Sequence, residues 1–148
     1  MILHKSSAHL MRKRTQSREF ALQILYQMDI TREDAQMSLA NFWDSHKEEE
    51  IRDDVRDFTV KLVCGVGENL KVIDDKISEF AANWKLERMA VVDRNILRMG
   101  CFELLFRDDI PPKVSINEAV DLAKKYSCAE AGKFVNAILD KIKLDKNK

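Results

Sequence analysis

Residues that break regular structure are scarce in this chain of 148 residues, which contains four glycines and two prolines. A sheet of many strands needs many tight turns, and tight turns rely on Gly and Pro, so the scarcity favours helices. No apolar run reaches the roughly 18 residues of a membrane-spanning helix. The cysteines form no C-x-x-C pair and have no histidine beside them, so neither a disulfide framework nor a metal site is expected.

The three cysteines, Cys64, Cys101 and Cys128, are expected to be reduced thiols packed in helices. Reduced thiols indicate a reducing compartment, and we expect a cytoplasmic protein. The amino terminus lacks the long apolar stretch of a secretory signal. Its Arg and Ser content also fits an organellar transit peptide, which stays a minor alternative.

Charge is balanced in sum but unevenly distributed along the chain. The sequence has 25 basic and 25 acidic residues. Residues 1–18 carry five basic residues and no acidic one, whereas residues 44–57 hold seven acidic residues against three basic ones. Such a chain can present a basic surface to an anion and still be neutral.

Apolar side chains recur with the period of a helix along nearly the whole chain. The first stripe runs over residues 20–28 and the last over residues 134–142. Residues 86–106 are apolar on more than one side, which predicts a central, buried helix. Strand alternation and repeats of roughly 20–50 residues are both missing. The sequence therefore predicts an all-α fold of about seven helices.

Local signals predict where these helices begin and end. Residues 31–34 and the capping boxes at 45–48 and 115–118 predict helix starts. Gly65 and Gly67 predict a helix end, and the pair Pro111-Pro112 predicts a stop.

These signals give a domain plan. We expect a flexible basic extension over residues 1–13 and a single helical domain over residues 14–148. Within it, two packed helical subdomains cover about 14–84 and 85–148.

Motifs of catalysis are missing from the sequence. It has no Gly-rich nucleotide loop, no H-E-x-x-H and no G-x-S-x-G. The acidic residues between 48 and 54 are interpreted as a solvated helix start. We expect no enzymatic activity and no cofactor.

A basic segment leads into the first helix. Its cations are Arg12, Lys13, Arg14 and Arg18, and Tyr26 follows two turns later. Basic side chains at this spacing can follow a phosphate backbone, and an aromatic ring beside them can stack an unpaired RNA base. A basic tail ahead of a tyrosine packed in the core would give the same pattern, so the segment alone does not decide.

Three parts of the sequence resemble the NusB family of transcription antitermination proteins. Residues 18–27 resemble its opening helix, and residues 93–104 its R-x-A-x-(Y/F)-E-L helix. The most specific match joins residues 114–126 and 133–141, which resemble I-N-E-A-(V/I)-x-L-A-K followed by K-F-V-N-G-(V/I)-L-D-K. The resemblance covers roughly residues 12–142.

This resemblance implies two packed helical subdomains and RNA binding without catalysis. Family members bind the boxA element of ribosomal RNA leader transcripts together with NusE, a small-subunit ribosomal protein. They thereby help RNA polymerase pass terminators. The implied RNA contacts are Arg14, Arg18, Tyr26, Lys133 and Phe134. Glu130 matches a position that tempers RNA affinity, and Asp93 matches one that faces NusE.

Departures from the family keep alternatives open. Thr15 and Gln16 stand where arginines are common, a loss for which Arg12 and Lys13 could compensate, and Ala137 replaces a glycine. A protein–protein scaffold that does not bind RNA is the main alternative. Some ribosomal RNA methyltransferases also carry a NusB-like domain, but no nucleotide-binding glycine motif follows here. Self-association also stays open.

At single positions, structural roles compete with functional ones. Tyr26 and Phe134 could be core residues, and Asp93 could simply be a charge at a helix start.

Overall fold

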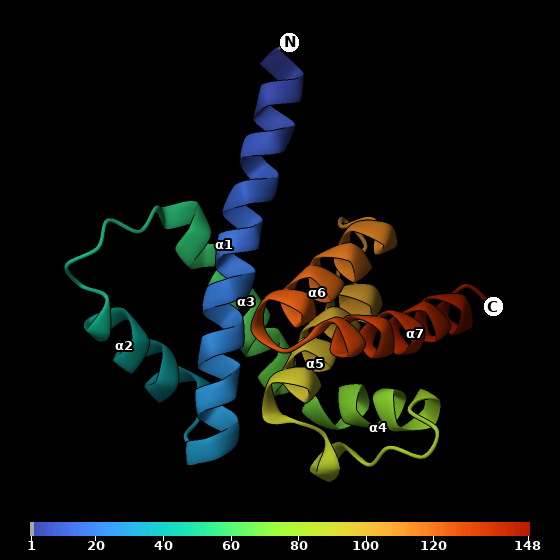
Figure 1. The fold of residues 1–148 in the computed structure, drawn as a ribbon. Coiled ribbons are helices and arrows are strands. Elements are labelled where there is room, and N and C mark those ends of the chain that lie inside the picture. Colours follow the sequence, from blue (N-terminus) through green and yellow to red (C-terminus); the bar gives the residue numbers. More distant parts are fainter. Residues whose placement is uncertain (1) are drawn as a thin grey trace. The chain divides into compact units, whose positions relative to one another are not determined.

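This computed structural model describes residues 2–148 of the chain (Figure 1). These residues form seven α-helices and one short 3₁₀ helix, joined by loops. Side chains are described for Leu10 and residues 12–148. The elements are α1 (Ile2–Thr31), α2 (Ala35–Ser45), α3 (Asp53–Glu68), α4 (Leu70–Phe80), η1 (Leu86–Arg88), α5 (Val91–Phe106), α6 (Pro112–Tyr126) and α7 (Ala129–Lys146). The all-α prediction is confirmed.

The chain divides into two compact units, Met1–Cys64 and Gly65–Lys148. The boundary falls within α3, whereas the sequence predicts it near residue 84. It lies earlier because α4 packs against α5 and α7 and so belongs to the second unit. The described residues of the 1–13 extension are the first turns of α1, and the flexibility expected of that extension stays a prediction.

In the first unit, α1 packs against α2 and is tied by hydroxyl groups to the start of α3. Ser17 Oγ donates to the carbonyl of Val55 at 2.9 Å. Thr59 Oγ1 donates to the same carbonyl at 2.8 Å and lies 3.4 Å from the carbonyl of Ser17. Ser17 and Thr59 are fully buried, so these bonds satisfy groups that water cannot reach.

One predicted helix start is confirmed and two are wrong. Asp34 caps α2 by accepting a hydrogen bond from the Met37 amide at 2.8 Å. Ser45 caps nothing: it ends α2, and its hydroxyl donates to the carbonyl of Asn41. Ser115 lies inside α6, which already begins at Pro112 because the fixed φ of proline suits the first turn of a helix. The pair Pro111-Pro112 therefore opens a helix as well as ending the preceding segment.

In the second unit, α5 is the central helix and packs against α4, α6 and α7. Nine of its residues are buried, as the sequence predicts. The expected segment 86–106 is nevertheless interrupted, because Met89 and Ala90 are extended between η1 and α5. The buried hydroxyl of Ser115 lies 2.9 Å from a carboxylate oxygen of buried Glu103, which joins α6 to α5.

Gly65 gives α3 a surface flat enough for a ring of α5. The helix ends at Glu68, next to Gly67, as predicted, but both glycines lie inside α3 and neither has a positive φ, so neither is the helix cap. A Cβ atom on Gly65 would come within 2.3 Å of the Phe102 ring. At Gly67 nothing lies within 4 Å of such an atom. Packing rather than helix termination therefore explains Gly65.

This contrast predicts opposite effects of one chemical change. Gly67→Ala should raise the free energy of unfolding by about 1 kcal/mol, since alanine is the better helix former. Gly65→Ala should lower it by about 1–3 kcal/mol, because overpacking against Phe102 outweighs that gain. Urea denaturation followed by circular dichroism measures both, and equal stabilisation of the two variants would contradict the packing role of Gly65.

Candidate nucleic-acid interface

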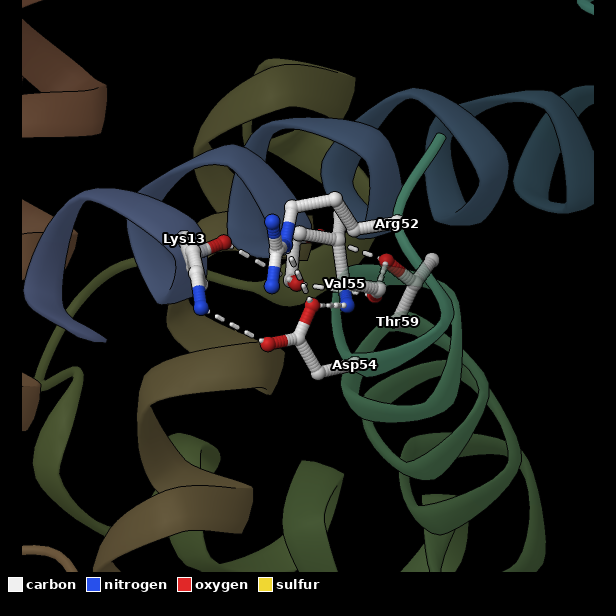
Figure 2. A network of polar contacts seen from close by, with 6 residues as sticks. Lys13, Arg52, Asp54, Val55 and Thr59 are labelled. Atoms are coloured by element: carbon white, nitrogen blue, oxygen red, sulfur yellow. Dashed lines mark hydrogen bonds and ion pairs between the residues drawn. The ribbon is translucent and has the colours of Figure 1, made fainter. Parts of the chain in front are cut away.

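The basic segment of α1 is partly neutralised within its own unit. Arg12 is exposed, but Lys13 Nζ lies 3.0 Å from Asp54 Oδ2 at the start of α3 (Figure 2). The hydrogen bond from Lys13 lowers the pKa of Asp54 below its ordinary value of 3.8, so the carboxylate stays charged at neutral pH. Lys13 is therefore held by an acid that competes with any phosphate.

Two further arginines of the segment lie over one aromatic ring. The guanidinium carbons of Arg14 and Arg18 are 4.7 and 5.5 Å from the ring centre of Phe58. Arg14 is half-buried, whereas Arg18 is only 2% exposed. Direct contact between Arg18 and a phosphate, as the resemblance implies, does not fit this burial. Arg18 instead stabilises the packing of α1 on α3.

Tyr26 lies further along the same helix with 38% of its surface exposed. The alternative that it is a core residue does not fit this exposure. Its ring is therefore accessible to a partner.

The remaining predicted residues lie in the second unit, around the start of α7. Lys133 has a side chain that is 78% exposed, and its ammonium lies 3.7 Å from the carboxylate of Glu130. Phe134 packs edge-to-face against Trp84, with 5.8 Å between the ring centres. Trp84 is itself 58% exposed. The start of α7 thus places a cation beside two accessible aromatic rings.

A cleft of about 310 Å³ brings three of the predicted residues together. Asp93, Glu130 and Phe134 all line it, together with Trp84 and Arg88. One carboxylate oxygen of Asp93 is buried and has no hydrogen-bond partner among the described residues. Asp93 also lies in the first turn of α5, so its charge suits the helix start as well as an incoming hydrogen-bond donor.

Trp84 and Arg88 are members of this cleft that the sequence analysis does not single out. Trp84 continues the helical spacing of Ile73, Ile77 and Phe80, so the sequence places it on the apolar face of that helix. In the structure α4 ends at Phe80, and Trp84 lies beyond it. Arg88 closes η1, and nothing in the sequence marks it as a cleft residue.

The three cysteines are all thiols, but their surroundings differ. Cys101 is buried, and burial raises the pKa of its thiol to about 12, so it stays protonated. Cys64 is half-buried in α3. Cys128 departs from the expectation of helix-packed thiols: it is exposed, precedes α7 and accepts the amide hydrogen of Ala131 as the helix cap.

Two searches of the described residues bear on the class of site. No group of three or more His, Cys, Asp or Glu side chains in this part of the chain could hold a metal ion. None of the described helices combines the length and hydropathy that crossing a lipid bilayer requires.

Comparison with known proteins gives consistent matches. The NusB family model matches residues 15–143. The transcription antitermination protein NusB of Anaeromyxobacter dehalogenans is 47% identical over 130 residues, which cover 88% of this chain and 89% of that protein. T. maritima NusB has a solved structure with a TM-score of 0.81 at 38% identity, covering 89% of this chain and 91% of that one.

A further match comes from the crystal structure of antitermination factors NusB and NusE in complex with double-stranded RNA. A chain of that complex gives a TM-score of 0.81 at 30% identity and covers 90% of this chain and 98% of its own length. The family model, the curated relatives and the solved structures thus agree over almost the whole sequence. This chain belongs to the NusB family.

Proposed function

We propose that this chain is a transcription antitermination factor that binds boxA-type single-stranded RNA of ribosomal RNA leader transcripts together with NusE. In this role it helps RNA polymerase read through terminators and performs no catalysis. Its similarity to the NusB chain that accompanies NusE and RNA supports the two partners. Its 47% sequence identity to the NusB of A. dehalogenans supports the role in antitermination.

The observation that carries the proposal is the aromatic pair at the start of α7. Phe134 and Trp84 present two differently oriented rings beside Lys133. Unpaired RNA bases stack on such rings, while a nearby cation attracts their phosphates. In the first unit, Tyr26 provides a further ring, and Arg12 and Arg14 provide positive charge.

The two acids of the cleft have different roles in this proposal. Glu130 lies beside Lys133, so its charge reduces the attraction of that lysine for phosphate. We assign the contact with NusE to Asp93, whose buried oxygen has no partner among the described residues and can accept a hydrogen bond from a protein donor.

The salt dependence of binding tests the proposal as a whole. Three phosphate contacts, from Arg12, Arg14 and Lys133, predict a slope of about −2 for log K against log salt on a single strand. Fluorescence anisotropy with a labelled boxA RNA, with and without NusE, measures this slope. Binding that NusE strengthens and that weakens roughly twentyfold between 50 and 200 mM salt is expected.

Several cations already have contacts within the protein, and this supports one competing function, that of a protein–protein scaffold. Lys13 is paired with Asp54, and Arg18 is buried, so a scaffold that binds proteins without RNA would also tolerate this arrangement. Association with NusE that is insensitive to salt, and no RNA binding, would favour the scaffold.

The aromatic pair predicts a specific loss. Phe134→Ala should weaken RNA binding about fivefold to a hundredfold, since a base stacked on an aromatic ring contributes about 1–3 kcal/mol. Phe106→Ala is the control, because Phe106 is a 44% exposed aromatic residue outside the cleft. It is the last residue of α5, whereas Asp93 lines the cleft from the first turn of that helix. Equal affinities of the two variants, both folded by circular dichroism, would remove stacking at α7 from the proposal.

Release of Lys13 should strengthen binding. Asp54→Asn removes the charge that holds Lys13. It keeps a side-chain oxygen that can accept the hydrogen bond from the Val55 amide, as Asp54 Oδ1 does at 2.9 Å. The salt slope should become steeper by about 0.7, the contribution of one further phosphate contact. Asp57→Asn removes the same charge from an exposed position of α3 and should change the slope little. Identical slopes in the two variants would mean that Lys13 does not reach RNA.

A further inference from the structure

A second cleft, in the first unit, has no part in the function proposed above. It lies between α1 and α2 and has a volume of about 390 Å³. Its polar lining includes three amide side chains, Gln23 and Gln27 from α1 and Asn41 from α2. These three residues are exposed, so a ligand can reach their amides from solvent.

A buried hydroxyl in the wall of this cleft lacks a partner. Ser38 is 4% exposed, lines the cleft and has no hydrogen-bond partner for its Oγ among the described residues. A buried hydroxyl without a hydrogen bond is unfavourable, and native proteins rarely leave one. Ser38 therefore indicates that the cleft receives a polar group.

Aromatic and imidazole rings form the end of the cleft. The rings of Phe42 and His46 are stacked, with 4.0 Å between their centres and 25° between their planes. Nδ1 of His46 lies 2.8 Å from the carbonyl oxygen of Phe42. Because a carbonyl only accepts, Nδ1 is the donor of this bond.

We propose that this cleft binds one unpaired adenine of the RNA that the chain recognises, an inference that rests on the proposed RNA-binding function. Unpaired bases are recognised by aromatic rings together with hydrogen bonds to their edges, and this cleft combines the two. Asn and Gln amides pair in two places with the amino group and ring nitrogen of adenine.

The lining residues favour adenine over guanine. Recognition of guanine through O6 and N7 uses Arg or Lys, and none of the nine residues that line the cleft is either. The one carboxylate that could accept the N1–H and N2–H groups of guanine, that of Glu33, already accepts from Asn41. The carboxylate of Glu33 also lines the cleft and accepts a hydrogen bond from Asn41 Nδ2 at 3.3 Å. This bond orients Asn41 with its carbonyl oxygen available to the adenine amino group.

The position of the cleft on α1 fits a strand that also contacts Tyr26. Gln23 precedes Tyr26 by three residues, so the two side chains are neighbours on the helix surface. Arg12 and Arg14 precede the cleft by roughly 15–20 Å along the helix axis. A strand of a few nucleotides can therefore contact the basic segment, Tyr26 and the cleft in turn.

Base substitution in the RNA, combined with substitution in the cleft, tests the proposal. Each adenine of a short boxA RNA is replaced in turn by uracil, and binding of the full chain is measured by fluorescence anisotropy. One replacement should weaken binding by about fivefold or more for the unaltered chain. The same replacement should have little effect on Asn41→Leu or Gln27→Leu, which have already lost the contact. Replacement of that adenine by guanine should weaken binding as well.

Gln36→Leu is the matched control, because Gln36 is an exposed amide on α2 outside the cleft. It should respond to the base replacements like the unaltered chain. If every adenine replacement has the same effect in Asn41→Leu and in Gln36→Leu, the cleft does not bind adenine and the proposal is overturned, while RNA binding itself stands.

A second measurement separates this inference from the proposed function. Adenosine and guanosine are added separately at millimolar concentration, and the side-chain amide resonances of Gln23, Gln27 and Asn41 are followed by NMR. Adenosine should shift these resonances and guanosine should shift them less. Failure of the RNA to bind, together with shifts caused by adenosine, would overturn RNA binding and retain an adenine cleft. Absence of shifts and of any base effect would overturn the cleft.

Discussion

The buried hydrogen bonds between α1 and the start of α3 are the constraint on which much of the first unit depends. Ser17 of α1 donates to the carbonyl of Val55 in α3. Thr59 donates to the same carbonyl within α3 and also lies 3.4 Å from the carbonyl of Ser17, in a place that water does not reach. A buried hydroxyl must find its partner or destabilise the fold, so these bonds fix the rotation and the register of α1. Through them, α1 directs Tyr26 toward solvent and the guanidinium of Arg18 toward Phe58.

Several charged side chains of the molecule are also paired with a neighbour in their own unit. Lys13 is paired with Asp54, Lys133 lies near Glu130 and Arg14 lies over Phe58, whereas Arg12 is exposed. The pair at Lys133 is fully at the surface and the pair at Lys13 is half-buried, and surface pairs contribute about 0–1 kcal/mol. They therefore stabilise the fold little, yet each one sets how much positive charge is available to a polyanion. This arrangement reconciles a neutral chain with the proposed binding to RNA.

Much of the fold could be predicted from the sequence because helical periodicity is a regular signal. The central position of α5 follows from this periodicity directly. The cap at Asp34 follows from the local signal at residues 31–34. The capping boxes failed at Ser45 and Ser115 because the pattern detects spacing only. A hydroxyl can prefer the carbonyl four residues earlier, as in Ser45, or a distant buried group, as Ser115 prefers Glu103.

The candidate site was less predictable, for a similar reason. The spacing of Arg14 and Arg18 shows that they share a face of α1, but it does not show that Phe58 lies against that face. The helical spacing of Ile73, Ile77 and Phe80 extends to Trp84 and predicts a core position, but only the folded second unit shows that Trp84 is exposed and packs against Phe134. Local patterns thus identify elements, whereas contacts between elements decide which side chains remain accessible.

Close contact between Gly65 and Phe102 has a consequence for how this sequence can change. The ring occupies the space that any side chain at position 65 would need. A larger residue there requires a smaller one at position 102, and a smaller residue at position 102 alone leaves a void between α3 and α5. The two positions are therefore coupled in evolution although they are far apart in the sequence, and each restricts which substitutions the other can accept.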